Sequence, residues 1–314
     1  MKQIVKLAAF ALTLCSFAAC QKSQPTANTN NATPAIAAAT PTPDAQAEAE
    51  LQQLRQAMQA EMKDEPENLH YNLGNIYLVE RKPNEAAEEF KKALALNAAD
   101  AASIVGLGRA YALTNRYPEA IAEYQKALAI NAKDPLAHFY LGEAYQKLDR
   151  LDDALRFYQE AAKLDARNAE IPARLGDIFL RQNQPREAVA GYRQAVKLKK
   201  DYADAYFNLG NAYDRLDQPK DAVKAFAQAA RLNPQDADAY FNLGNTYARL
   251  NQTDDAIKAY QQVVKLKPDD ADSYYFLALQ FLKRGEPAQA QEQLAKLKTL
   301  RPDLAQELAK KLGQ

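Results

Sequence analysis

The most regular feature of this chain is a pattern of apolar and small residues that returns at a fixed interval, such as that from Gly74 to Gly108. Six copies contain Leu-Gly, and all seven have an aromatic residue three positions later and an alanine twelve positions later. The glycine positions are Gly74, Gly108, Gly142, Gly176, Gly210 and Gly244, with Ala278 in the seventh copy. Leucine and the aromatic residue are four apart, so they share one face of an α-helix. The pattern predicts repeating pairs of antiparallel helices, and each pair needs neighbours to cover its apolar face.

The repeat divides most of the chain into seven units. They are expected at 67–100, 101–134, 135–168, 169–202, 203–236, 237–270 and 271–304. The ends of such a stack also need covering helices, because a terminal unit has a neighbour on one side only. Leu54 and Met58 predict an N-terminal capping helix within 47–66, and Leu308 lies on the apolar stripe of a C-terminal capping helix at 303–314.

The period and the order Leu-Gly, Tyr, Ala, Phe/Tyr, Ala and Pro resemble the tetratricopeptide repeat (TPR). This resemblance implies an all-α fold, a right-handed α-solenoid of about seven helix-turn-helix units with terminal capping helices. It also implies that the first helix of each unit lines an inner groove, where members of the family bind extended peptides. The expected partner is therefore a protein or an extended peptide client, and self-association is an open alternative.

Asparagines in the predicted first helices are candidates for contact with such a client. They stand two positions before or one position after the glycine, at Asn72, Asn75, Asn208, Asn211, Asn242 and Asn245. An amide can donate to a peptide carbonyl and accept from a peptide N–H at once, so a row of amides would grip peptide backbone. The row resembles the asparagine ladders of some TPR superhelices. The alternative is that these amides contact only water, and the sequence leaves both interpretations open.

A second set of candidates is basic and stands five positions after the glycine or alanine. Its members are Lys147, Arg181, Arg215, Arg249 and Lys283. These side chains would meet an acidic partner segment or a carboxylate, or they would compensate the helix macrodipole near a helix C-terminus. The second interpretation is favoured. Arg174 alone occupies a place that resembles the carboxylate clamp of chaperone-binding TPR proteins, so recognition of a chaperone's acidic tail is not expected.

The first residues of the chain predict a targeting signal rather than a folded element. Residues 1–19 have a positive start, a short apolar run and small residues at the end, which is typical of a secretory signal peptide. The four residues ending at Cys20 resemble a bacterial lipobox, which implies cleavage before Cys20 and lipidation of it; the alternative is an ordinary signal peptide. Residues 20–46 would then form the lipidated cysteine and a disordered tether. Gln21, by resemblance to the sorting rule of lipoproteins, favours the outer membrane, facing the periplasm.

Composition narrows the chemistry that is available. Lys and Arg together number 40, as do Asp and Glu, so a nucleic-acid partner is not expected. The two cysteines, Cys15 and Cys20, both lie at the front of the chain, and His70 and His138 are the two histidines. Both histidines stand at a packing position of the repeat. No catalytic, phosphate-binding or metal-binding motif is found in the sequence. We therefore expect no enzyme, no cofactor, no metal and no small-molecule substrate. The expected role is a scaffold or adaptor in the bacterial envelope, with an assembly factor that acts through the solenoid edges as the alternative.

Overall fold

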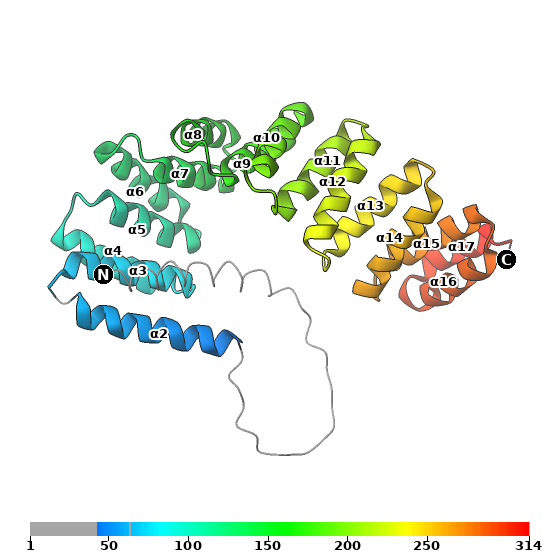
Figure 1. Ribbon diagram of the computed structural model, residues 1–314, viewed down its shortest axis with the longest axis horizontal. Helices are drawn as coiled ribbons and strands as arrows, with labels where there is room; N and C mark the ends of the chain where they lie inside the picture. The colour runs from blue at the N-terminus through cyan, green and yellow to red at the C-terminus, as the bar shows by residue number, and fades with distance from the viewer. Residues whose placement is uncertain (1–42, 63, 314) are drawn as a thin grey trace, which may run out of the picture. The chain divides into compact units, whose positions relative to one another are not determined.

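The computed structural model describes residues 43–62 and 64–313. This described part contains 16 α-helices and no strand, which confirms the predicted all-α fold (Figure 1). The chain divides into two compact units, residues 1–157 and 158–314. The boundary falls inside α8 (Leu151–Leu164), the second helix of the third repeat.

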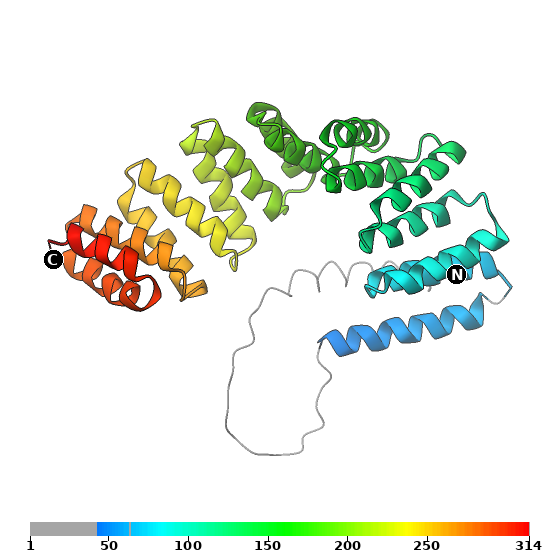
Figure 2. The ribbon, with the colours of Figure 1, turned by 180° about the vertical axis from the view of Figure 1, so that it is seen from behind.

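In the first unit a single helix is followed by helix pairs in chain order (Figures 1 and 2). Its helices before α8 are α2 (Pro43–Glu61), α3 (Pro66–Val79), α4 (Pro83–Leu96), α5 (Ala101–Leu113), α6 (Tyr117–Ile130) and α7 (Pro135–Lys147). The helices α3 and α4 pack on each other, as do α5 and α6, and α4 also packs on α5. Leu54 and Met58 of α2 are buried beside Ile76 of α3, so α2 covers the first pair.

The helix α2 begins at Pro43, ahead of the predicted start of the capping segment at position 47. Proline is tolerated in the first turn of a helix, where its missing N–H leaves no hydrogen bond unmade. The alanine and glutamate residues that follow it favour helix. The end of the segment predicted as a tether, 20–46, is therefore helical from Pro43 onward.

The second unit contains the end of α8, three complete pairs before the last, and a final single helix. Its helices after α8 are α9 (Glu170–Arg181), α10 (Pro185–Leu198), α11 (Ala203–Arg215), α12 (Pro219–Leu232), α13 (Ala237–Arg249), α14 (Thr253–Leu266), α15 (Ala271–Arg284), α16 (Pro287–Leu300) and α17 (Pro302–Lys311). Within this unit α10 packs on α11, α12 on α13 and α14 on α15, and α17 packs on α15 and α16. Leu308 of α17 is fully buried in the same apolar cluster as Leu294 and Leu297. The hydroxyl of Tyr275 also donates to Glu307 of α17.

In five of the units the repeat glycine faces a large ring from the second helix of the same unit. A Cβ atom added at Gly210 would lie 2.6 Å from ring carbons of Phe226, which is 1% exposed. The same relation holds for four other glycine–ring pairs: Gly74 with Phe90, Gly108 with Tyr124, Gly176 with Tyr192, and Gly244 with Tyr260. In the last unit Ala278 replaces the glycine, and the corresponding large residue is the slimmer Leu294.

A left-handed residue ends the first helix of every pair. Its φ lies between 54° and 82° at Arg81, Asn115, Asp149, Asn183, Asp217, Asn251 and Gly285, which recur at the same interval as the repeat itself. The N–H of the next residue bonds back to the carbonyl of the aromatic residue three after the glycine, as in Gln218 to Tyr213 at 2.9 Å. This is the bonding of a Schellman cap, which turns the chain into the second helix. Four second helices then begin with a proline at the same repeat position: Pro83, Pro185, Pro219 and Pro287.

Candidate functional site

In two of the pairs, the side chain of the residue after the glycine accepts a hydrogen bond from the buried tyrosine of the same unit. The Tyr192 hydroxyl donates to Asp177 Oδ1 at 2.6 Å, and the Tyr260 hydroxyl donates to Asn245 Oδ1 at 2.6 Å. A buried tyrosine hydroxyl needs such a partner, because leaving it without a hydrogen bond costs free energy. The amide oxygen of Asn245 is therefore used inside the fold.

The residue two positions before the glycine can reach the preceding unit. Asn208 on α11 donates from Nδ2 to Asp177 Oδ1 on α9, at 3.2 Å. Asp177 thus accepts from Asn208 and from Tyr192. Burial raises the pKa of the Asp177 carboxyl above its ordinary value, although these hydrogen bonds and Arg174 act in the opposite direction. Arg174 itself is held by Glu170 at 2.8 Å and lies 3.8 Å from Asp177, so the clamp-like arginine is engaged within α9.

Asn211 and Asn242 differ from these residues, although they occupy the same repeat positions. The separation in sequence between Asn211 and Asn242 equals that between Asp177 and Asn208. Asn211 on α11 and Asn242 on α13 therefore occupy the same pair of repeat positions as Asp177 and Asn208. The ring of the Asn211 unit is Phe226, which has no hydroxyl to bond. Among the described residues, neither amide has a side-chain hydrogen bond, and both are half-buried. The donors and acceptors of these two amides are therefore unused by the described part of the chain.

The asparagines of the first unit are used locally. The Asn72 amide points at Met62 Sδ, at 3.6 Å, and the Asn75 amide donates to the Tyr71 carbonyl at 3.2 Å. The six predicted asparagines therefore do not form one equivalent set. We name the four on α11 and α13, which are Asn208, Asn211, Asn242 and Asn245, the amide row.

Three of the five predicted cations link consecutive units. Arg215 donates to the Leu180 carbonyl at the end of α9, at 2.7 Å. Arg249 donates to Asp214 and also to Asp217, the latter at 2.7 Å. Lys283 donates to Asn251 Oδ1 at 2.6 Å. These cations sit at the C-terminal end of the preceding first helix, where the macrodipole favours positive charge.

The other two cations, Lys147 and Arg181, are exposed in the last turns of α7 and α9. Their position in the last helical turn agrees with the macrodipole interpretation of this column. The sequence pattern therefore identified a structural column of cations more clearly than a binding site.

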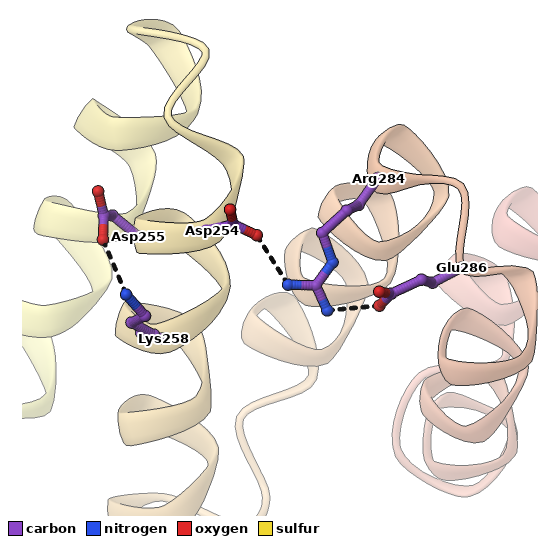
Figure 3. A network of polar contacts seen from close by, with 5 residues as sticks. All are labelled: Asp254, Asp255, Lys258, Arg284 and Glu286. Atoms are coloured by element: carbon purple, nitrogen blue, oxygen red, sulfur yellow. Dashed lines mark hydrogen bonds and ion pairs between the residues drawn. The ribbon is translucent and has the colours of Figure 1, made fainter.

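Further linking contacts were not predicted from the sequence. Arg284 reaches from the end of α15 to Asp254 in the first turn of α14, at 2.8 Å, and also pairs with Glu286 (Figure 3). Beside this link, Asp255 pairs with Lys258 within α14 at 3.2 Å (Figure 3). The left-handed column was also missed, although asparagine, aspartate and glycine recurring at the interval of the repeat were a usable signal for it.

The histidines have structural partners. His70 Nδ1 lies 2.6 Å from Glu89 Oε2, and His138 Nε2 lies 3.1 Å from the Ala132 carbonyl. Within the described residues, no three histidine, cysteine or acidic side chains gather where they could hold a metal ion. The helices of the described part also include none that is long and apolar enough to cross a bilayer. The predicted signal peptide and Cys20 lie outside the described residues.

Two sequence families match this chain. Residues 119–309 match the family described as "Cilia and flagella-associated protein 70 C-terminal domain", and residues 71–135 match the family described as "Tetratricopeptide repeat". A comparison with curated protein sequences gives no match.

Several solved structures are similar to the chain. One is the crystal structure of YrrB, described as a TPR protein with an unusual peptide-binding site, with 26% identity and a TM-score of 0.55. It is covered over 97% of its length by 60% of this chain. The MamA crystal structure has 28% identity and a TM-score of 0.50, with 52% of this chain and 90% of MamA covered. The C-terminal part of a TPR repeat-containing protein from Cytophaga hutchinsonii has 16% identity and a TM-score of 0.65, covering 76% of this chain and 98% of that one.

Proposed function

Because this chain belongs to the tetratricopeptide repeat family, we propose that it is a non-catalytic scaffold that binds an extended peptide segment of a client protein. The binding surface in this proposal is the amide row on α11 and α13. The likeness to YrrB, whose description names a peptide-binding site, supports a peptide as the ligand.

The observation that carries the proposal is the contrast within the amide row. The side-chain amides of Asn208 and Asn245 each have a hydrogen-bond partner inside the fold, whereas those of Asn211 and Asn242 have none among the described residues. A half-buried amide without a partner loses part of its hydration and gains nothing in return. A peptide backbone offers an N–H and a C=O at the spacing of each residue, and one amide can bond both.

The proposal also includes the place in the cell. The signal-like start and the lipobox-like residues before Cys20 support a lipid anchor in the bacterial envelope, with the outer membrane favoured by Gln21. In this arrangement the lipid fixes the scaffold to the membrane, and the helix pairs hold the client beside it.

Site-specific photo-crosslinking of the full chain tests the proposal. A crosslinking side chain at Asn211 or Asn242 is expected to trap the same client segment, identified by mass spectrometry. The control position is Gln261, which is exposed on the second helix α14. Trapping of one client from Gln261 and not from the amide row would move the binding surface away from the first helices.

A further inference from the structure

A recessed surface on the second helices carries a different chemistry from the amide row. It is a shallow, open depression of about 530 Å³ between α10 and α12, with α11 as its floor. The floor is formed by Tyr206, Leu209 and Tyr213. Both tyrosines are half-buried, so part of each ring faces the depression. The floor therefore offers apolar and aromatic surface to a ligand.

The rims of this depression concentrate positive charge. Five cations line it: Arg193, Lys197 and Lys200 on the α10 side, and Lys224 and Arg231 on α12. The one acidic residue among the lining residues is Asp221, which pairs with Lys224 at 2.9 Å. Arg231 bonds the amide oxygen of Gln228 at 3.0 Å.

The three cations on the α10 side are exposed and have no ion pair or hydrogen bond among the described residues. Their charges are therefore available to an approaching anionic group. Arg193 and Lys197 are one helical turn apart on α10, and like charges at that spacing repel each other, so an acidic partner would relieve this repulsion.

The charge is specific to this place in the repeat. The same six repeat positions one unit later hold Ala227, Arg231, Pro234, Lys258 and Lys265, with Asp255 as the acid. That neighbouring surface thus has three cations where the depression has five. Equal totals of acidic and basic residues in the whole chain make this local excess stand out from the average.

We propose that this basic depression binds an acidic peptide segment of a partner protein. Carboxylates of the segment would pair with the cations on both rims, and its apolar side chains would pack on Tyr206 and Tyr213. Charge-assisted hydrogen bonds and burial of aromatic surface favour the same ligand, a chain of alternating acidic and apolar residues. A recessed floor between two helices suits a single segment better than a flat lipid surface. A nucleic acid is disfavoured because the chain as a whole is not basic.

This site is separate from the amide row and adds to the proposed function. Leu209 and Asn211 are two positions apart on α11, which places their side chains about 200° apart around the helix. Leu209 packs against residues of α10 and α12 and lines the depression, and Asn211 is not among the lining residues. One chain would therefore hold two segments, one at each site.

Titration of the full chain with a fluorescein-labelled peptide of alternating Glu and Leu tests the proposal by fluorescence anisotropy. The matched probe has Gln in place of every Glu. The acidic peptide is expected to bind more tightly than the Gln peptide, with a preference that shrinks as salt is added. Lys224→Gln with Arg231→Gln should weaken binding of the acidic peptide by roughly threefold to tenfold.

The matched control is Lys258→Gln with Lys265→Gln. It removes the two positive charges at the same repeat positions one unit later and should leave the affinity for the acidic peptide unchanged. Arg193→Gln, Lys197→Gln and Lys200→Gln together should weaken binding in the same way as the α12 pair. Circular dichroism of each variant checks that these surface changes leave the helices intact. Asn211→Ala with Asn242→Ala should leave the difference in affinity between the acidic and the Gln peptides unchanged, because backbone contacts do not depend on the peptide's side chains; this separates the site from the proposed function.

Three outcomes would overturn the proposal. The first is equal affinity for the acidic and the Gln peptides. The second is an equal loss in the α12 pair and its matched control. The third is binding of phosphatidylserine vesicles that depends on the five cations, with no binding of the acidic peptide; that result would assign the depression to a membrane surface.

Discussion

Replacing Gly210 by alanine tests the close contact between the two helices of a pair. The added Cβ would lie 2.6 Å from ring carbons of Phe226, closer than two carbon atoms can approach without one of them moving. The ring is 1% exposed, so it cannot move away from the added atom without displacing the residues packed around it. The chain itself shows the compensated arrangement in its last unit, where Ala278 stands with Leu294.

Two opposing terms set the magnitude of the effect. Alanine is better than glycine in a helix interior by about 1 kcal/mol. Overpacking of a filled core costs about 1–3 kcal/mol. We therefore expect Gly210→Ala to lower the free energy of unfolding by up to about 2 kcal/mol while Phe226 is present. In the Phe226→Leu background the clash is removed, and the same change should stabilise the protein by about 1 kcal/mol.

Urea unfolding of the four proteins in this double-mutant cycle, followed by circular dichroism and tyrosine fluorescence, measures the coupling. Coincident transitions by the two probes are needed, because repeat arrays can lose two-state behaviour. The expected coupling between the sites is about 1–3 kcal/mol. The same effect of Gly210→Ala in both backgrounds would show that the ring of Phe226 does not limit the distance between the helices.

Three further predictions concern the acid, the linking cations and the anchor. Burial raises the pKa of Asp177 in the folded protein. The contribution of this carboxyl to stability therefore falls as the pH rises from its unfolded pKa through its folded pKa. Asp177→Asn keeps the hydrogen-bond acceptor for Tyr192, so it should raise the melting temperature at neutral pH and not at acidic pH. An equal gain at both pH values would refute this. Arg249→Gln should cost no more than about 1 kcal/mol, and less at high salt, because its ion pairs are exposed; urea titrations at two salt concentrations measure it, and a larger, salt-independent loss would contradict it. Cys20→Ser should release the protein from the membrane fraction or leave it unprocessed, and unchanged fractionation and mass would remove the lipid anchor from the account.

The fold was predictable because the residues that pack the helix pairs recur in the sequence at one fixed interval. Glycine, leucine and aromatic residues recur at fixed offsets, and each offset corresponds to a contact that every pair repeats, such as Gly210 with Phe226. The left-handed column was equally periodic, yet it includes Arg81, which has no preference for that conformation. Repetition therefore predicts contacts within a pair better than it predicts backbone geometry at the turns.

The candidate site was less predictable because residues at one repeat position have different partners. Asn208 and Asn242 are identical in sequence position, but the residue that faces Asn208 is an aspartate and the one in register with Asn242 is another asparagine. Whether a side-chain amide has a hydrogen-bond partner depends on its neighbours on other helices. A comparison of one repeat position along the sequence does not show these neighbours. The basic depression was missed for the same reason, because its cations come from α10, the turn after it and α12, and from different repeat positions.

Calorimetric titration of the crosslinked client segment, made as a synthetic peptide, into the full chain and into Asn211→Ala with Asn242→Ala tests the central claim most directly. Each lost amide hydrogen bond is worth about 0.5–1.5 kcal/mol, so the double variant should bind the peptide about 1–3 kcal/mol more weakly. Its helix content should not fall, because alanine is the better helix former. The exposed pair Gln261→Ala with Gln262→Ala on α14 serves as the matched control and should keep full affinity. Full affinity in the amide variant would contradict the claim that the first helices hold the client.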